Sequence, residues 1–170
     1  MKEQKPISHF IAGLIISAML IVFSLGIYFL DMMQNRAMAW ISYLILIGGL
    51  ILFINLYGKA KNYELGFGGL FGYGFKSTAI IALSMGLFSL LFFLAFPEFK
   101  EQILEMTRNA MEEQGKATDK QIEDMVSMMD KNFLLFYIGF PILGYVFFGV
   151  IGSLIGAAVT RKNPVNPLNQ

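Results

Sequence analysis

The sequence predicts an all-α integral membrane protein with four transmembrane helices and an extramembrane amphipathic helical hairpin between the third and the fourth. Three observations lead to this fold class. The 170 residues are 56% hydrophobic and 15% charged, with a mean hydropathy of +0.61, whereas soluble domains carry about a quarter charged residues. Four long stretches lack Asp, Glu, Lys and Arg, and 14 of the 25 charged residues fall within residues 98–131.

Each of the four apolar stretches is long enough to cross a bilayer. A hydrocarbon core of about 30 Å needs roughly 20 helical residues, and in lipid only helices or closed barrels satisfy the backbone. The stretches lack the alternation of barrel strands, so we expect helices within one membrane domain over residues 1–170. The predicted spans cover about residues 10–30, 37–58, 77–97 and 133–160.

The polar excursion at residues 98–131 is expected to form two helices. Apolar residues recur at helical spacing in both of its halves. Between them Gly115 suits the end of one helix, and Thr118 with Gln121 has the spacing of a capping box that starts the next. Nine acidic and five basic residues give the excursion a charge of −4, opposite to what an anionic membrane surface attracts. We therefore expect a hairpin outside the membrane that caps the bundle or faces a partner.

The positions of the basic residues predict that both termini are cytoplasmic. Four spans place the termini and the middle loop on one side, with residues 98–131 on the other. Six of the seven basic residues on the terminus side lie within five residues of a span end, against three of six on the opposite side. Basic residues beside short loops set orientation. Residues 98–131 are accordingly predicted to be periplasmic.

Small residues predict where the helices pack. Lipid removes the hydrophobic drive between helices, so association depends on close backbone approach at glycine, alanine and serine. One such face lies in the fourth span and a second Gly-x-x-x-Gly lies just before the third, in a stretch that we expect to be flexible, re-entrant or interfacial. Contact within one bundle is the more ordinary role, and a dimer face is the alternative. The predicted packing residues are Gly149, Gly152, Ser153, Gly156 and Ala157, together with Gly68 and Gly72.

The composition argues against catalysis. The chain has no cysteine and one histidine, which excludes thiolate metal centres, a cysteine nucleophile and bis-histidine haem. No ionisable residue lies at membrane depth, where ion and proton pathways need one. The net charge of +1 gives no reason to expect nucleic acid. We predict no catalytic residue, metal site or cofactor, and Asn55 is the candidate polar site within the spans.

The pattern resembles a bacterial envelope family known as a domain of unknown function, number forty-one ninety-nine. The resemblance covers nearly the whole chain, and the polar insertion before the last span is part of it. It implies a four-helix inner-membrane protein of Gram-negative bacteria, with no activity or site to carry over. The other residues that carry it are Tyr57, Lys59, Lys61, Gly66, Phe67, Phe75, Lys76, and Gly156 to Lys162 with Pro164.

Two functions remain open from the sequence. The leading hypothesis is a non-enzymatic membrane protein that acts through helix–helix assembly, as a homo-oligomer or with a membrane protein partner, in contact with the lipid bilayer. The glycine face of the fourth span and the outer hairpin are the surfaces expected to be used. The alternative is a small transporter or permeability factor for a neutral or lipid-like solute. A ligand-binding role of Asn55 would favour the alternative.

Overall fold

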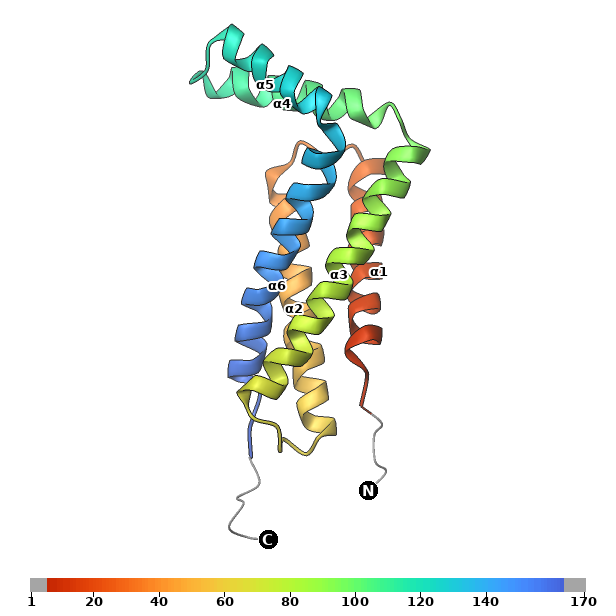
Figure 1. Cartoon of the computed structure of the whole chain (residues 1–170), viewed down its shortest axis with the longest axis vertical. Helices are drawn as coiled ribbons and strands as arrows, with labels where there is room; N and C mark the ends of the chain where they lie inside the picture. The colour runs from red at the N-terminus through yellow and green to blue at the C-terminus, as the bar shows by residue number, and fades with distance from the viewer. Residues whose placement is uncertain (1–5, 164–170) are drawn as a thin grey trace. The chain divides into compact units, whose positions relative to one another are not determined.

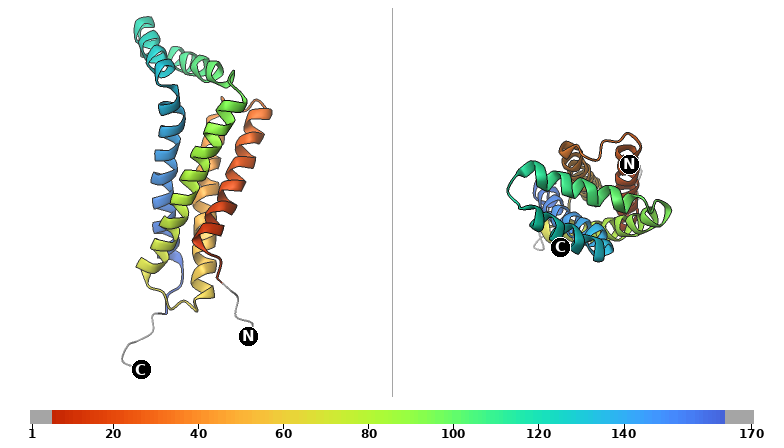
Figure 2. Two further views of the ribbon diagram at one scale, coloured as in Figure 1. Left: turned by 45° about the vertical axis from the view of Figure 1, so that its right-hand side comes forward. Right: turned by 90° about the horizontal axis from the view of Figure 1, so that it is seen from above.

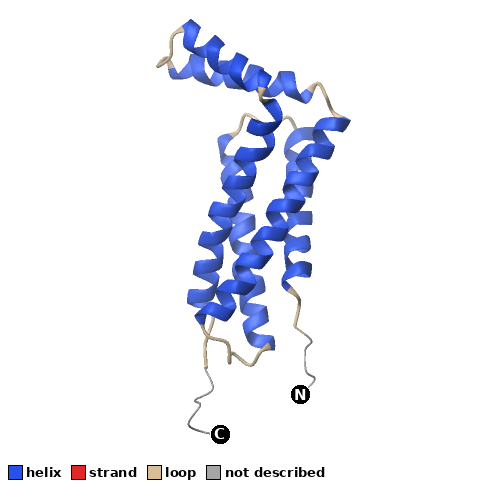
Figure 3. Cartoon of the chain, viewed as in Figure 1, coloured by secondary structure: helices blue, strands red, loops and turns tan. Residues whose placement is uncertain are grey.

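The structure, a computed structural model, describes residues 6–163 apart from the side chain at position 36, and this part of the chain contains helices and no strand (Figure 3). Lys2, Lys5 and Pro164, which entered the sequence predictions, lie outside the described residues. The elements are α1 (His9–Phe29), α2 (Arg36–Ala60), α3 (Phe67–Ala95), α4 (Phe99–Gln114), α5 (Asp119–Lys131), the π-helix η1 (Leu135–Gly139) and α6 (Phe140–Val159).

Four helical segments are long and apolar enough to cross a membrane. They are His9–Phe29, Ala37–Ala60, Phe67–Ala95 and Leu135–Val159. Between 22% and 33% of the most apolar window of each is buried within the chain, so most of their apolar surface faces outward. A water-soluble protein rarely exposes so much contiguous apolar surface, whereas lipid requires it. The described residues thus confirm the all-helical fold with four long apolar helices, and these helices are compatible with a membrane protein.

The chain forms two compact units. Unit 1 contains Met1–Met85 and Leu143–Gln170, and therefore α1, α2, most of α3 and most of α6. Unit 2 contains residues 86–142, which are the end of α3, α4, α5, η1 and the first residues of α6. Each unit is described by itself.

In unit 1 the four helices run side by side (Figures 1 and 2). Their facing sides bury Ile16, Leu50, Ile54 and Ile81 almost completely. The opposite sides carry exposed leucines and valines, which lipid can solvate. These outward residues include Val22, Leu44, Leu52, Leu83 and Val159, with exposed fractions of 56% to 71%.

The third helix begins at Phe67, rather than at Ser77 as the sequence led us to expect. The glycine-rich stretch before Ser77 is helical because its apolar residues pack on neighbouring helices: Leu70 is fully buried and the Tyr73 ring stacks on Tyr57 with centroids 4.1 Å apart. Lys76 ended the predicted span because it is charged. In the structure its side chain is exposed, and a lysine stem can reach from an apolar helix to the headgroups.

Unit 2 is built around the α4–α5 hairpin, whose turn has the predicted chemistry. Gly115 follows α4 with a left-handed φ of 60°, and Thr118 and Gln121 form both hydrogen bonds of a capping box at the start of α5. At the open end of the hairpin, the rings of Phe99 and Phe133 contact the ring of Tyr137. The two helices are therefore held at both ends.

A π-helix precedes the proline of the fourth span. Pro141 has no backbone N–H, so the carbonyl four residues earlier, on Tyr137, loses its α-helical donor. The chain forms the π-helix η1 over Leu135–Gly139, and a π turn shifts backbone pairing by one residue. The shift lets the helix continue through the proline.

Candidate functional site: helix contacts at glycine and hydroxyl residues

The small-residue face of α6 is buried inside unit 1. Gly149, Gly152, Ser153, Gly156 and Ala157 are all buried. A Cβ added to Gly156 would lie 2.6 Å from Cδ1 of Ile54, and one added to Gly152 would lie 3.2 Å from Cα of Ile47. Side chains and backbone of α2 therefore occupy the space that a side chain on α6 would need. This face is used by helices of the same chain.

Helices α3 and α6 also make a reciprocal contact. Thr78 of α3 packs against Gly149 of α6, where an added Cβ would overlap the threonine side chain. Ser153 of α6 packs against Gly74 of α3, where an added Cβ would lie 2.7 Å from the serine Oγ. Each helix thus presents a glycine to the hydroxyl residue of the other.

The hydroxyl groups at this contact are bonded within their own helices. Thr78 Oγ1 donates to the Gly74 carbonyl at 3.0 Å, and Ser153 Oγ donates to the Gly149 carbonyl at 2.7 Å. The two hydroxyl oxygens are 3.4 Å apart, but each hydroxyl has a single hydrogen. Their mutual contact is therefore mainly packing.

The same bond recurs at every Gly-x-x-x-Ser/Thr spacing in the sequence. Ser17 donates to the carbonyl of Gly13, and Thr160 donates to the carbonyl of Gly156, both at 2.7 Å. No buried side-chain polar atom in the described residues lacks a partner. These hydroxyls satisfy themselves in an apolar environment, and the arrangement is structural rather than nucleophilic.

The second glycine pair has no close neighbour within the part of the chain that the structure describes. Among those residues, nothing beyond the adjacent backbone of α3 lies within 4 Å of a Cβ added to Gly68 or Gly72. Gly68 is exposed and Gly72 is half-buried; Phe75 and Ala79, which follow at helical spacing, are exposed, Phe75 by 47%. These four residues form one side of the first half of α3, here termed the open α3 face.

Asn55 lies on the exposed side of α2. Its neighbours Ile54 and Gly58 face the other helices and are buried, but Asn55 is not. The residue therefore points out of unit 1 rather than into a path between its helices.

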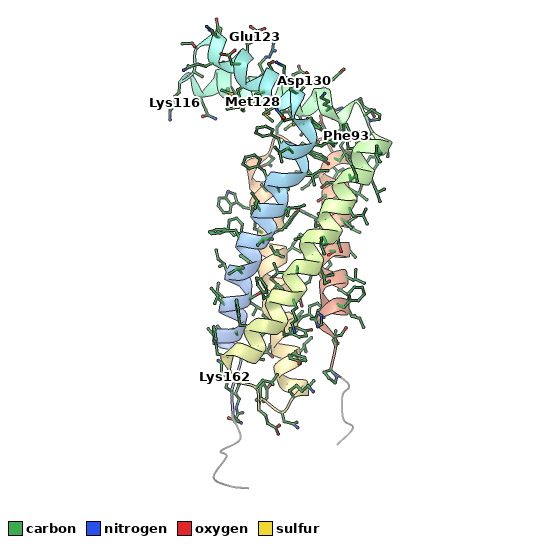
Figure 4. The ribbon with its side chains drawn as sticks, in the orientation of Figure 1. Phe93, Lys116, Glu123, Met128, Asp130 and Lys162 are labelled. Carbon is green, nitrogen blue, oxygen red and sulfur yellow. The ribbon has the colours of Figure 1, made fainter. Side chains whose placement is uncertain are left out.

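A groove of about 700 Å³ lies between α4 and α5. Its lining holds five of the nine acidic residues of the excursion and one of its five basic residues, so it carries a charge of −4, and the eight remaining charges of the excursion cancel. One of the five carboxylates, Asp130, is paired with Lys100 at 2.6 Å. Glu123 and Asp130 mark the α5 side of the groove (Figure 4). The charged lining residues are Glu101, Glu105, Glu112, Glu123, Asp130 and Arg108.

Among residues 6–163, no three His, Cys, Asp or Glu side chains come together as metal ligands would. The acidic groove therefore spreads its carboxylates along the two helices. Its chemistry is that of an electrostatic surface.

The sequence analysis named the α6 face but not the other glycine and hydroxyl residues between the helices. Gly74 and Thr78 of α3 contact α6, Gly13 of α1 lies against Ile80 of α3, and Ser17 of α1 is buried. Their signal was the Gly-x-x-x-Ser/Thr spacing, which places a hydroxyl over the carbonyl of a glycine one turn earlier. A search for Gly-x-x-x-Gly alone does not find it.

The family resemblance is confirmed. A family model described as a protein of unknown function (DUF4199) matches residues 12–162. No curated protein and no solved structure matches the chain. The match supplies no activity, so the helix contacts are the basis for any functional argument.

Proposed function

Because the chain belongs to the DUF4199 family, which brings no activity with it, we propose a function from the helix contacts. The protein is a non-enzymatic, multi-pass protein of the bacterial inner membrane that acts through helix–helix assembly with a second copy of itself. Both termini are cytoplasmic in this proposal, and the α4–α5 hairpin lies in the periplasm.

The observation that carries the proposal is the open α3 face. Of the two Gly-x-x-x-Gly pairs, Gly152 and Gly156 are covered by α2, whereas among residues 6–163 no other helix lies within 4 Å of a Cβ added to Gly68 or Gly72. Glycine lets another helix approach closely, and in lipid this approach is the main source of association. The uncovered glycine pair continues into exposed Phe75 and Ala79 on the same side of α3. This side therefore offers a surface to a helix from another molecule.

A second copy is the occupant that fits this face. Copies inserted in one membrane share an orientation, so their α3 helices are parallel and can meet about a two-fold axis. A two-fold contact uses the same patch on both subunits, and a glycine pair is self-complementary in that arrangement. Lys76 lies at the edge of the face and is exposed, so its ammonium group can turn toward the headgroups.

Fluorescence resonance energy transfer between copies labelled with a donor or an acceptor dye, in lipid vesicles, tests the proposal. We expect wild-type copies to show energy transfer that falls only when the protein is strongly diluted with lipid. Gly72→Leu should abolish the transfer at dilutions where wild type retains it, because the leucine holds the two backbones apart.

Gly48→Leu is the matched control. Gly48 is also a glycine of an apolar helix for which no other helix of the described chain lies within 4 Å of an added Cβ, but it is not part of a Gly-x-x-x-Gly pair. It should leave transfer unchanged. Equal transfer for wild type and Gly72→Leu would refute association through this face, and association only with another protein would replace the second copy by that partner.

A further inference from the structure

The turn between α2 and α3 meets the end of α6 at a corner of unit 1. A Cβ added to Gly58 would lie 2.7 Å from Cγ2 of Thr160, so the two helix ends touch. The backbone N–H of Asn163 donates to the Tyr63 carbonyl at 2.6 Å. The contacts bring together segments about a hundred residues apart in the sequence, and Figures 1 and 2 show these segments at the same end of unit 1.

Two neighbouring residues at this corner have a strained backbone, and the side chain of one of them lies beside a cation. Asn62 and Tyr63 both have left-handed φ values, 52° and 61°. Asparagine tolerates this region, whereas a bulky tyrosine rarely adopts it. In this conformation the Tyr63 ring lies beside the Arg161 guanidinium, with 5.9 Å between Cζ and the ring centroid. Strained backbone of this kind persists where surrounding contacts impose it, and here it sets the Tyr63 ring beside a positive charge.

Three cations at the corner have no carboxylate partner among residues 6–163. Lys59, Lys61 and Arg161 are exposed, and within the described residues none has a carboxylate oxygen within 4.0 Å. Glu64 is the single acidic residue between Asp31 and Glu98 in the sequence. It forms no ion pair with any of the three cations. Lys162 differs, because its Nζ donates to the carbonyls of Ala158 and Thr160 at 3.0 Å each and so caps α6 (Figure 4).

Apolar residues lie next to these cations, toward the middle of the spans. Leu56 of α2 is 40% exposed, and Ile155 and Val159 of α6 are 41% and 62% exposed. Leu56 precedes Lys59 by three residues, and Ile155 and Val159 precede Arg161 by six and two. A membrane phospholipid presents the same order, with a negative phosphate above apolar chains.

We propose that this corner, formed by Lys59, Lys61, Tyr63 and Arg161, binds the phosphate of an anionic membrane phospholipid whose chains lie along Leu56, Ile155 and Val159. Basic sites between membrane helices are suited to such headgroups. The site uses the ends of α2 and α6 and not the open α3 face, so it goes beyond the proposed assembly. Lipid retention can be measured whether or not the copies associate.

Native mass spectrometry of the purified full-length protein tests the site with two lipids, phosphatidylglycerol and phosphatidylcholine. We expect wild type to retain phosphatidylglycerol preferentially. Lys59→Gln and Arg161→Gln should each weaken that retention about fivefold, the effect of one basic contact near a headgroup. Tyr63→Asn should also weaken it, because asparagine accepts the left-handed backbone but no longer holds the guanidinium.

Lys76→Gln is the matched control, since it removes one exposed positive charge from α3 outside the corner. It should leave retention within twofold of wild type. An equal loss for Lys76→Gln and Arg161→Gln would show that general surface charge attracts the lipid and would overturn the proposal. Equal retention of the two lipids would also overturn it, as would displacement of the lipid by inorganic phosphate at millimolar concentration, which would indicate a soluble anion site.

Discussion

At several positions where two helices touch, only glycine leaves enough room for the neighbouring helix. A Cβ would overlap Thr78 at Gly149 and would come within 3 Å of neighbouring atoms at Gly74 and Gly156. Close packing of this kind requires neighbouring atoms to shift before a side chain can be added. The glycine positions, rather than the polar groups beside them, should therefore dominate the stability of the helix contacts.

Gly149→Leu tests this reasoning. The added side chain would clash with Thr78, and overpacking of a tight core costs about 1–3 kcal/mol. We expect a lower midpoint of thermal unfolding in detergent, and the same direction for Gly156→Leu. Gly48→Leu should leave the midpoint nearly unchanged, because an added Cβ there meets nothing within 4 Å. Equal midpoints for all three variants would contradict the packing described for α6.

The Thr78 and Ser153 hydroxyls are expected to contribute little to the free energy of contact between α3 and α6. Each already donates to a carbonyl of its own helix, so the energy shared between them should be small. A double-mutant cycle with Thr78→Val and Ser153→Ala should give a coupling of about 0.6 kcal/mol or less, the average for such pairs in membranes. A coupling several times larger would mean that the two hydroxyls bond directly to each other.

Which glycines pack could not be predicted from the sequence. Gly68 and Gly72 have the same spacing as Gly152 and Gly156, yet the first pair is open and the second is buried. The spacing shows only that residues share a face of a helix. Whether a neighbouring helix covers that face depends on the rotation and tilt of α3, which Leu70 and Tyr73 set through tertiary contacts.

At the level of elements, the four spans and the helical hairpin were predictable because their signals are long and redundant. Composition determines the spans, and a left-handed glycine and a capping box determine the α4–α5 turn. The start of α3 was not predictable by the same rule. A single lysine, Lys76, interrupted the charge-free run, although one charge that reaches the membrane surface does not end a helix.

The α4–α5 turn gives a prediction for these elements. Gly115→Ala places a Cβ in a left-handed conformation, and Thr118→Ala removes the side-chain cap of α5; each should cost about 1 kcal/mol. Limited proteolysis should therefore cut faster between α4 and α5 in both variants than in wild type. Lys116→Ala is the control, because Lys116 has neither role. Unchanged cleavage in the two cap variants would show that the turn does not depend on them.

The proposed orientation is a prediction for the whole molecule. The chain contains no cysteine, so single cysteines report their own exposure. In intact cells, a membrane-impermeant maleimide that crosses the outer membrane should label Lys116→Cys in the α4–α5 turn. It should label Glu64→Cys between α2 and α3 only after the inner membrane is opened. The reverse pattern would invert the topology.

Assembly through the open α3 face is the central claim for the whole molecule, and cysteine crosslinking in native membranes tests it most directly. Ala79→Cys should form a disulfide-linked dimer on mild oxidation, because a two-fold contact brings the two copies of that residue within disulfide reach, a Cβ separation of about 4 Å. Leu52→Cys, on the exposed side of α2, should stay monomeric. Dimer from Leu52→Cys alone, or from neither variant, would contradict the account.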